Sequence, residues 1–427
     1  DVSGNDMLMW WEHDDVTRLA VLYLESFGNP RKFARTARRV GTKLPVLTVS
    51  AGHTAADQAL FEQAGVIATG SFGELTETIA LLATQPVPAG RNVAVVSNVG
   101  GAGALAAGTC TDLGLTVHQP HGLTRRRLRA LLPGGTVTGP VDTTAAISAG
   151  DFRRCLELIA ADDDVDAMIA LVLPTGATGD LIQAIQDADI GVPLAAVALG
   201  QAESVRLIPR SADDTRIPVY GYPEAAAAAL ARAARYEAWR TEPRGQVPTF
   251  RDVRTADARA LVTGFLHRES DGGWLPAGQT ADLLRCYGIW LAELIPAGCE
   301  DEAITGGVEV MIGVADDSVF GPLVVFGGGG AATEVLADHA TRLTPLTDTD
   351  ADALIRSVRT APSLLAADLD RLRELLLRVA RLADDLPEVT ELELNPVIVK
   401  PHGVFAVDGR IKVAPCVPQD PFLRKLR

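Results

Sequence analysis

Apolar runs alternate with amphipathic segments along the first part of the chain. Residues 19–24 (LAVLYL) and 44–49 (LPVLTV) are apolar enough for buried strands, whereas residues 29–40 and 57–65 have helical spacing of apolar positions. A short strand at 66–69 and a helix at 72–85 follow. This alternation predicts a parallel sheet covered by helices.

The same order returns further along the chain. The predicted strands and helices of this second part are a strand, glycine turn and helix over 91–114, a helix at 151–162, a strand at 166–173, a helix at 179–188, strands at 192–199 and 217–220, and a helix from 223. The spacing from Val21 to Pro45 equals that from Ile169 to Pro193, 24 positions in each case. Each copy ends with a helix carrying an acidic residue near its start, Glu74 or Glu224. We therefore expect a duplicated flavodoxin-like, doubly wound module.

The remainder of the chain has a different pattern. Residues 241–255 are polar and contain proline, as expected of a linker. Strands at 308–314 and 321–327, joined through a turn at 315–317, precede a long helix at 368–386. Residues 389–413 predict two strands joined by a turn at His402-Gly403. The expected domains are thus 1–88, 89–240 and an α+β domain at 256–416, followed by a tail at 417–427.

Composition and charge limit the partners and the location that the protein can have. The formal net charge of -15 argues against nucleic acid or an anionic membrane as the main partner. No apolar stretch approaches the roughly 20 residues of a bilayer-spanning helix, and no signal segment opens the sequence, so we expect a soluble, cytoplasmic protein. The scattered cysteines lack metal-type spacing and are predicted to be reduced and mostly structural: Cys110, Cys155, Cys286, Cys299 and Cys416.

A glycine-rich turn is the first candidate for chemistry. In VAVVSNVGGAGALAAG, Gly100, Gly101 and Gly103 allow close backbone approach at a helix N-terminus, where free amides attract an anion. Asn98 can add a side-chain donor. Tight strand-to-helix packing explains the same glycines equally well.

His53 is the second candidate. It follows an apolar strand and lies among small residues in VSAGHTAAD, whereas the comparable loop of the second copy reads ALGQAES. The fold therefore does not require the histidine, and ligands of open α/β sheets bind at this end of the strands. Its imidazole can carry a phosphoryl group if a carboxylate orients the ring, and Glu25 after the neighbouring strand is placed to do so. The competing interpretation of His53 is an ordinary loop histidine. The competing interpretation of Glu25 is an acidic residue that caps a helix.

An oxygen-rich strand is the third candidate. Strand alternation places Glu391, Glu393 and Asn395 on one face, with Leu392 and Leu394 in the core. Together with Asp408 on the expected partner strand, these residues suit Mg²⁺ bound with nucleotide phosphates. The alternative is an exposed acidic strand face.

Taken together, these segments resemble the ADP-forming acyl-CoA synthetases of the succinyl-CoA-ligase-like superfamily. The resemblance rests on DVSGNDML, which by itself looks like a turn, YLESFGNPRKFARTARR, HTAA, VAVVSNVGGAG, GPVDTTAA, IPVYGYPEAAAAAL, FGPLVVFGGGGAATEVLADHATRL and ELELNPVIV. It implies two ligase-type flavodoxin-like domains followed by a partial ATP-grasp domain.

The resemblance also implies roles for individual residues. His53 would be a phosphohistidine stabilised by Glu25, and Glu393 would receive this histidine in the ATP-grasp domain. Asn395 and Asp408 would hold Mg²⁺, and the turn from Asn98 to Gly103 would bind phosphate. The implied reaction converts acyl-CoA, ADP and phosphate into carboxylate, coenzyme A and ATP, and we expect a homo-oligomer.

The sequence also departs from the family pattern. An N-terminal CoA-binding domain, the segment before 307 with its nucleotide-binding lysine, and residues around HTAA are missing or shortened, so we expect a longer natural chain. A catalytically silent regulatory region of a protein lysine acetyltransferase, with an acetyltransferase domain attached, is the alternative function. Retention of His53 favours the enzyme.

Overall fold

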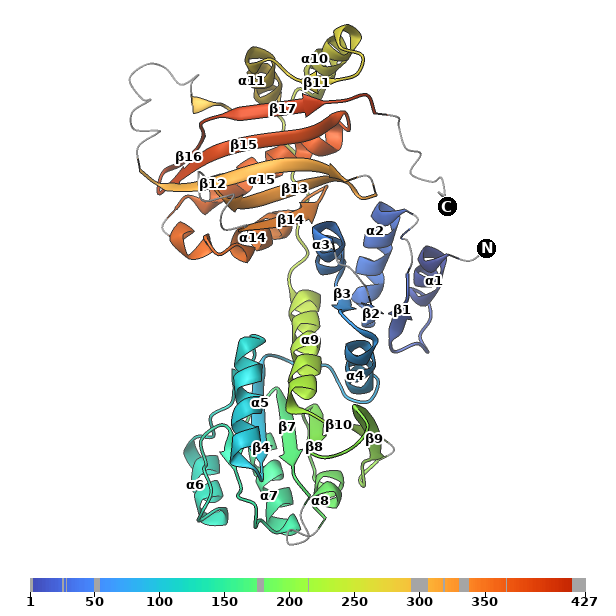
Figure 1. Cartoon of the computed structure of the whole chain (residues 1–427), viewed down its shortest axis with the longest axis vertical. Coiled ribbons are helices and arrows are strands. Elements are labelled where there is room, and N and C mark those ends of the chain that lie inside the picture. Colours follow the sequence, from blue (N-terminus) through green and yellow to red (C-terminus); the bar gives the residue numbers. More distant parts are fainter. Residues whose placement is uncertain are drawn as a thin grey trace. The chain divides into compact units, whose positions relative to one another are not determined.

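The computed structural model divides the chain into two compact units (Figure 1). Residues 1–26, 36–51 and 65–242 form the first unit, and residues 27–35, 52–64 and 243–427 form the second. The structure describes residues 3–24, 27, 29–49, 54–174, 180–213, 215–292, 306–317, 319–329, 338–365 and 367–416.

A small parallel sheet opens the chain. Its strands are β1 (Ala20–Leu22), β2 (Val46–Val49) and β3 (Val66–Thr69), paired in that order. The helices of this region are α1 (Gly4–Trp11), α2 (Pro30–Gly41), α3 (Ala55–Ala64) and α4 (Phe72–Leu82). The predicted turn at the start of the chain is in fact α1, because Ser3 and Asp6 form a reciprocal capping box that begins a helix.

A second, larger sheet follows in the same unit. Its strand order is β5-β4-β7-β8-β10-β9, with β6 paired to β4. The strands are β4 (Asn92–Ser97), β5 (Thr116–Val117), β6 (Val141–Asp142), β7 (Ala167–Val172), β8 (Leu194–Ala198), β9 (Val205–Pro209) and β10 (Arg216–Tyr220). All pairings are parallel except that of β9, which the sequence analysis missed, with β10. Apart from β6 and the additional β9, this is the flavodoxin-like order.

Helices cover both faces of the larger sheet (Figure 1). They are α5 (Gly100–Asp112), α6 (Gly122–Leu131), α7 (Ala149–Ala160), α8 (Leu181–Asp187) and α9 (Pro223–Thr241). Every residue of the central strand β7 is buried, because one face packs against α7 and α8 and the other against α5 and α9.

The two parallel sheets share one pairing pattern. Val21 of β1 lies opposite Leu47 of β2, and Ile169 of β7 lies opposite Ala195 of β8, an offset of 26 residues in both sheets. The helices that close the two copies, α4 and α9, pack together, and Glu74 of α4 forms an ion pair with Arg232 of α9. These pairings support the predicted duplication.

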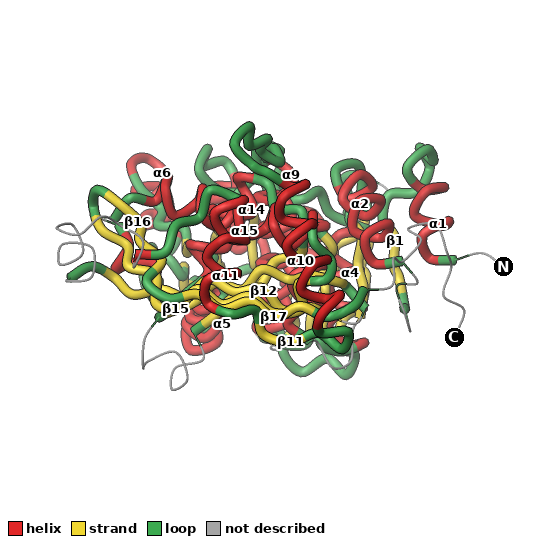
Figure 2. The backbone as a smooth tube through the Cα atoms, turned by 90° about the horizontal axis from the view of Figure 1, so that it is seen from above, coloured by secondary structure: helices red, strands yellow, loops and turns green. Residues whose placement is uncertain are grey.

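The C-terminal sheet is antiparallel and belongs to the second unit. Its order is β11-β17-β15-β12-β13-β14, with β16 paired to β15. The strands are β11 (Gly273–Trp274), β12 (Val308–Asp317), β13 (Gly321–Gly328), β14 (His339–Leu343), β15 (Val389–Lys400), β16 (Gly403–Ala406) and β17 (Gly409–Val413). Figure 2 shows β12, β15 and β17 running side by side.

Within the described part of the second unit, five helical segments pack with this sheet. They are α10 (Thr255–Arg268), α11 (Ala277–Cys286), α14 (Asp348–Ser357), the 3₁₀ helix η3 (Ala361–Leu364) and α15 (Leu369–Asp385). Leu372, Leu376 and Val379 of α15 are fully buried in one core with Val310 and Ile312 of β12. The strongly amphipathic pattern of the long helix is therefore explained by its position against the sheet.

Two details of this sheet differ from the sequence prediction. Residues 315–317 extend β12 instead of forming a turn, and Asp317 pairs with Gly321 at the end of the β12–β13 hairpin. The segment 389–413 forms three strands, since the chain leaves β16 at Ala406 and begins β17 at Gly409. Both β16 and β17 pair with the long strand β15.

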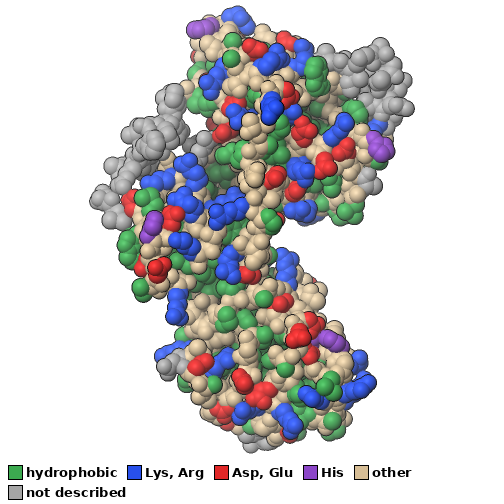
Figure 3. All heavy atoms as spheres, turned by 180° about the vertical axis from the view of Figure 1, so that it is seen from behind, with side chains coloured by type: hydrophobic (Ala, Val, Ile, Leu, Met, Phe, Trp, Pro, Cys, Tyr) green, Lys and Arg blue, Asp and Glu red, His purple; other side chains and the backbone are tan. Residues whose placement is uncertain are grey.

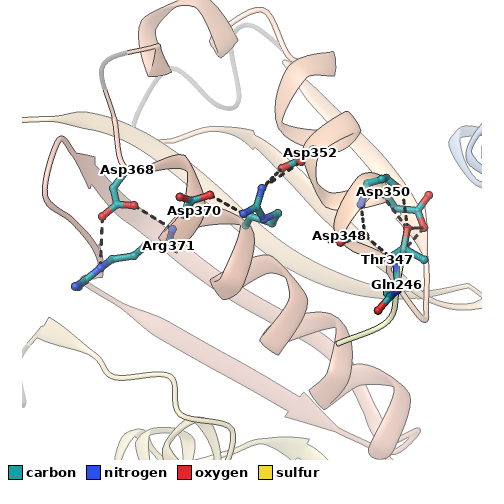
Figure 4. A network of polar contacts seen from close by, with 10 residues as sticks. Gln246, Thr347, Asp348, Asp350, Asp352, Asp368, Asp370 and Arg371 are labelled. Atoms are coloured by element: carbon teal, nitrogen blue, oxygen red, sulfur yellow. Dashed lines mark hydrogen bonds and ion pairs between the residues drawn. The ribbon is translucent and has the colours of Figure 1, made fainter. Parts of the chain in front are cut away.

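The segment between α9 and α10 contacts both α14 and α15, since its Asp252 also forms a 3.0 Å ion pair with Arg378 of α15. The Gln246 amide donates a 2.8 Å hydrogen bond to the Asp348 carboxylate, and the Gln246 carbonyl accepts one of 3.1 Å from the Asp348 amide (Figure 4). Asp348 begins α14, which Thr347 and Asp350 start with a capping box. Beside it, Arg373 of α15 bridges Asp352 and Asp370. The domain boundaries given above remain predictions.

Charged side chains of both signs lie on the surface (Figure 3), and buried cysteines lie in the core. Acidic and basic side chains are interspersed over the face shown in Figure 3. Cys110 and Cys155 are buried free thiols, and burial raises the pKa of Cys110 to about 11 and that of Cys155 to about 12. Within the described part of the chain, no helix is long and apolar enough to cross a membrane.

Candidate functional site

The glycine turn of the second sheet joins β4 directly to α5. The N-cap residue of α5, Val99, offers no side-chain hydrogen bond to the first turn of the helix. Val99 therefore leaves the first-turn amides of α5 without a capping side chain, and the partial positive charge of a helix N-terminus attracts anionic groups.

The three glycines of this turn have different surroundings. A Cβ atom on Gly100 would lie 2.5 Å from Oδ2 of Asp142, and one on Gly103 would lie 3.1 Å from Cβ of Ser97. A Cβ on Gly101 would meet no atom within 4 Å. Close packing therefore accounts for Gly100 and Gly103, whereas only Gly101 faces open space. Asp142 was missed by the sequence analysis, because 42 positions separate it from Gly100 and only the fold brings the two together.

Asn98 acts differently from the expected anion donor. Its side chain is buried, its Oδ1 accepts a hydrogen bond of 2.8 Å from the Leu173 amide, and its Nδ2 donates one of 3.1 Å to the Leu173 carbonyl. The amide group thus ties the end of β4 to the chain just after β7. This correction follows from the need to satisfy buried main-chain groups where two parallel strands end.

His53 and Glu25 lie outside the described residues. The described chain before His53 ends with β2 at Val49, and the chain after it enters α3 through Thr54. Thr54 and Asp57 form a capping box: the Thr54 amide and hydroxyl both bond the Asp57 carboxylate, and the Asp57 amide bonds the Thr54 hydroxyl at 3.1 Å. The residue that follows His53 in sequence therefore begins a well-capped helix.

Helix α3 is anchored to β14 within the second unit. The Gln63 side chain accepts a 2.8 Å hydrogen bond from the Leu343 amide and donates one of 3.3 Å to the Leu343 carbonyl. Arg342, which is buried, forms an ion pair of 3.0 Å with Glu62. The side-chain amide of Gln63 thus imitates one residue of a strand pairing with β14.

The face of β15 has the predicted alternation. Leu392 and Leu394 are buried in the C-terminal core, whereas Glu391, Glu393 and Asn395 are only partly buried. Glu393 lies opposite Arg410 in the β15–β17 pairing. Its Oε2 accepts a hydrogen bond of 2.8 Å from Arg410 Nε, and its Oε1 accepts one of 3.1 Å from Asn395 Nδ2.

These contacts determine the charge state of Glu393. Burial pushes the pKa of the carboxyl upward, but hydrogen bonds from Arg410 and Asn395, together with the arginine charge, outweigh burial and lower the pKa below 4.5. Glu393 is therefore ionised at neutral pH. Such a carboxylate can accept a hydrogen bond from an approaching imidazole and stabilise its positive charge.

The expected magnesium cluster is more open than predicted. Asp408 lies in the connection between β16 and β17, not on a strand, and its carboxylate accepts a 2.7 Å hydrogen bond from the Gly409 amide. Main-chain pairing still brings Asp408 beside Asn395, because the Asn395 amide donates a 3.3 Å hydrogen bond to the Asp408 carbonyl. Glu391 lies opposite Lys412. The face thus combines acidic side chains with cross-strand basic partners.

Arg410 is the residue of this site that sequence reasoning missed. Besides holding Glu393, its guanidinium lies 5.1 Å from the ring centroid of Trp274 on β11. The alternation of VDGRIKV contained a signal, but its register against β15 depends on the short strand β16, which the sequence analysis did not recognise.

Comparisons with known proteins agree with this arrangement. A family model described as a succinyl-CoA ligase-like flavodoxin domain matches residues 1–82, and one described as an ATP-grasp domain matches residues 300–413. The chain is 28% identical to acetate–CoA ligase [ADP-forming] I of Archaeoglobus fulgidus over 501 aligned positions, covering 96% of this chain and 72% of the relative. The alignment is longer than the 427-residue chain, so the relative has additional residues within the aligned region.

Two further relatives extend the comparison. The 4-hydroxybutyrate–CoA ligase [ADP-forming] of Nitrosopumilus maritimus is 24% identical, with 96% of this chain and 72% of the relative covered. The crystal structure of PH0766 from Pyrococcus horikoshii has 26% identity and a TM-score of 0.50 over 56% of this chain and 57% of the solved chain.

Fold and matches together define an α/β protein of flavodoxin-like ligase domains followed by an ATP-grasp domain. This confirms the fold class expected from the sequence. The chain contains a succinyl-CoA ligase-like flavodoxin domain and an ATP-grasp domain, and it is similar to the ADP-forming acyl-CoA ligases with which it aligns.

Proposed function

We propose that this protein is an ADP-forming acyl-CoA synthetase of the acetate–CoA ligase type. It interconverts acyl-CoA, ADP and phosphate with carboxylate, coenzyme A and ATP. The observation that carries the proposal is the ionised Glu393 carboxylate, held by Arg410 in the domain that matches the ATP-grasp model. The ADP-forming ligases aligned over 96% of the chain support the same reaction.

In this proposal His53 carries the phosphoryl group between two sites. A nitrogen of its ring attacks the phosphorus of an acyl phosphate, the bond to the acyl oxygen breaks, and the carboxylate leaves. Glu25 orients the ring through the other nitrogen. The partial positive charge at the start of α3, next to Thr54, favours a phosphate on the preceding residue.

The same proposal assigns the phosphate-binding role to the start of α5. Main-chain amides beside Gly101 are the donors, because a side chain there would meet only open space and an anion can approach the backbone. Asn98 supports this turn by fixing β4 to Leu173. Gly100 and Gly103 allow the close packing that holds the helix start in place.

In the ATP-grasp domain, Glu393 receives the imidazole of His53 and stabilises its charge during phosphoryl transfer to ADP. Asn395 and Asp408 provide one amide and one carboxylate oxygen, a donor set that fits Mg²⁺, which takes few protein ligands. The ion would neutralise the charge on the nucleotide phosphates.

The proposal includes small-molecule partners and a cellular setting. Acyl-CoA, a carboxylate, coenzyme A and an adenine nucleotide are the ligands, and a homo-oligomer in the cytoplasm is the expected form. An attached acetyltransferase domain and a silent regulatory role receive no support from the named relatives, which favour a ligase.

Labelling with ATP carrying labelled γ-phosphate tests the proposal. With Mg²⁺ present, the protein is expected to acquire acid-labile label, which His53→Ala abolishes. His267→Ala on α10 is the matched control and should retain the label. Coenzyme A with acetate should then discharge the label as acetyl-CoA forms. Label that persists in His53→Ala, or failure of the native protein to acquire any, would contradict the proposal.

A further inference from the structure

Four side chains with metal-binding atoms meet in the second sheet's domain. His118, His121, Asp162 and Asp164 each offer one nitrogen or oxygen atom, and these four atoms all lie within 4.8 Å of one another. Among the residues that the structure describes, this is the group of histidine, cysteine and acidic side chains close enough to hold a metal ion.

The topology places this cluster away from the proposed phosphate site. His118 follows β5, and its amide bonds the Val93 carbonyl near the start of β4 at 2.9 Å. Asp162 and Asp164 lie in the turn that leads into β7. The cluster is therefore at the amino-terminal edge of β4 and β7, whereas the glycine turn follows their carboxyl-terminal edge.

The buried histidine is held between carboxylates. His118 is 2% exposed; its Nε2 lies 3.0 Å from Oδ2 of Asp162, and its Nδ1 lies 3.6 Å from Oδ1 of Asp164 and 3.4 Å from Nδ2 of Asn92. The second oxygen of Asp162 is bonded by the Thr124 hydroxyl.

A simple ion pair does not account for the fourth member. His121 is the N-cap residue of α6 but makes no capping hydrogen bond, and its ring centroid lies 6.2 Å from that of His118. Within the described ranges, the ring nitrogens of His121 have no hydrogen-bond or ion-pair partner. A second imidazole beside a buried His–Asp pair adds nothing to the pair, but it completes a set of two nitrogens and two oxygens.

We propose that His118, His121, Asp162 and Asp164 form a binding site for a divalent transition-metal ion, with Zn²⁺ as the best match. Zn²⁺ accepts four histidine and carboxylate ligands in a tetrahedron at about 2.0–2.2 Å, which places ligand atoms roughly 3.4 Å apart. The four atoms now lie up to 4.8 Å apart, so binding requires the exposed side chains of His121 and Asp164 to turn toward the ion. Two nitrogen ligands disfavour Mg²⁺ and Ca²⁺, so the site differs from the magnesium site of the ATP-grasp domain.

The bound ion would join two loops that are distant in sequence. It would connect the segment between β5 and α6 to the turn between α7 and β7, and so stabilise the edge of the sheet opposite the glycine turn. The proposal does not depend on catalysis, because none of the four residues belongs to the proposed phosphate or nucleotide sites.

Metal binding by the full chain tests the site. The protein is first treated with a chelator. Zn²⁺ is then added in the presence of excess Mg²⁺ but without nucleotide or coenzyme A, and binding is followed by calorimetry. The metal content is also measured after dialysis. One Zn²⁺ ion per chain is expected, and His121→Ala and Asp164→Asn should each weaken binding about tenfold or more. His267→Ala should bind as the native protein does.

Two further readouts keep the test independent of folding. Circular dichroism should be unchanged in His121→Ala and Asp164→Asn, because both side chains are exposed. Zn²⁺ should raise the melting temperature of the native protein but not of these variants. Native-like Zn²⁺ binding by both variants would assign the ion to other ligands, such as free thiols, and would overturn the proposal, as would no binding by the native protein.

Discussion

Glu393 of β15 and Arg410 of β17 lie directly opposite each other, and the Arg410 Nε donates a 2.8 Å hydrogen bond to Oε2 of Glu393. The arginine side chain is 61% exposed, whereas the glutamate side chain is 24% exposed. The pair therefore keeps a partly buried carboxylate ionised with a cation that remains largely in water.

Arg410→Gln should weaken both stability and phosphoryl transfer. The lowered pKa of Glu393 means that the folded state gains stability at pH above 4.5 and loses that gain as the pH falls through the lowered value. We expect a loss of up to about 1 kcal/mol at pH 7, measured by chemical denaturation, since the pair is near the surface. The difference between variant and native protein should shrink as the pH falls through the lowered pKa of Glu393, and an equal difference at neutral and strongly acidic pH would contradict the assignment.

Gly100→Ala and Gly101→Ala form a matched pair at the glycine turn. The first places a Cβ atom 2.5 Å from Asp142 Oδ2 and should lower the melting temperature, whereas the second meets no atom within 4 Å. In a first helical turn, Gly101→Ala should leave stability unchanged or raise it by up to about 1 kcal/mol. It should nevertheless reduce acyl phosphate formation, because the methyl group obstructs an anion. Unchanged turnover in Gly101→Ala would show that no anion binds at this turn during the reaction.

Asn98→Ala distinguishes a structural from an anion-binding role. Removal of the side chain leaves the amide and carbonyl of Leu173 without their partner, which should cost about 1–3 kcal/mol. If Asn98 served only an anion, its removal would lower phosphate affinity without changing thermal stability. Differential scanning calorimetry of the two proteins without ligand provides the measurement.

The parallel strands could be predicted because burial on both faces makes them continuous apolar runs, as in Ala167–Val172. The helix at Gly4–Trp11 was missed because its start signal is a capping box spanning only Ser3 to Asp6. The alternation of Leu392 and Leu394 was correctly predicted, because a strand with one buried face has period two.

Contacts between distant segments were beyond sequence reasoning. The Glu393–Arg410 pair requires the register of β17, and Asp142 reaches Gly100 only through the pairing of β6 with β4. His118 and Asp162 meet because β5 and β7 flank β4 on either side. Such juxtapositions depend on sheet order, and local spacing contains no information about it.

Gln63→Ala should loosen the attachment of α3 to β14. Both main-chain groups of Leu343 lose a partner, so we expect a loss of about 1–2 kcal/mol and faster hydrogen exchange of the Leu343 amide. Gln58→Ala is the control on the same helix, because its side chain bonds Glu62, whereas Leu343, whose exchange is measured, is bonded by Gln63. Equal exchange of Leu343 in both variants would contradict the anchoring role.

Thiol reactivity should follow burial. Cys416 is exposed, whereas Cys110 and Cys155 are buried with pKa values of about 11 and 12, so their thiolates are scarce at neutral pH. Titration with a chromogenic disulfide should lose one rapidly reacting thiol in Cys416→Ser, and none in Cys110→Ser or Cys155→Ser. Rapid reaction of Cys155 in the native protein would show that the larger sheet's core opens easily.

The offset of 26 residues between paired positions in the two parallel sheets has an evolutionary consequence. We infer that one ancestral unit was copied in tandem and that both descendants preserved its register while the connections leaving β2 and β8 diverged. A reactive imidazole could then evolve in one copy without loss of the fold. The other copy folds with glutamine, alanine and serine in the comparable loop, so the fold does not depend on the histidine.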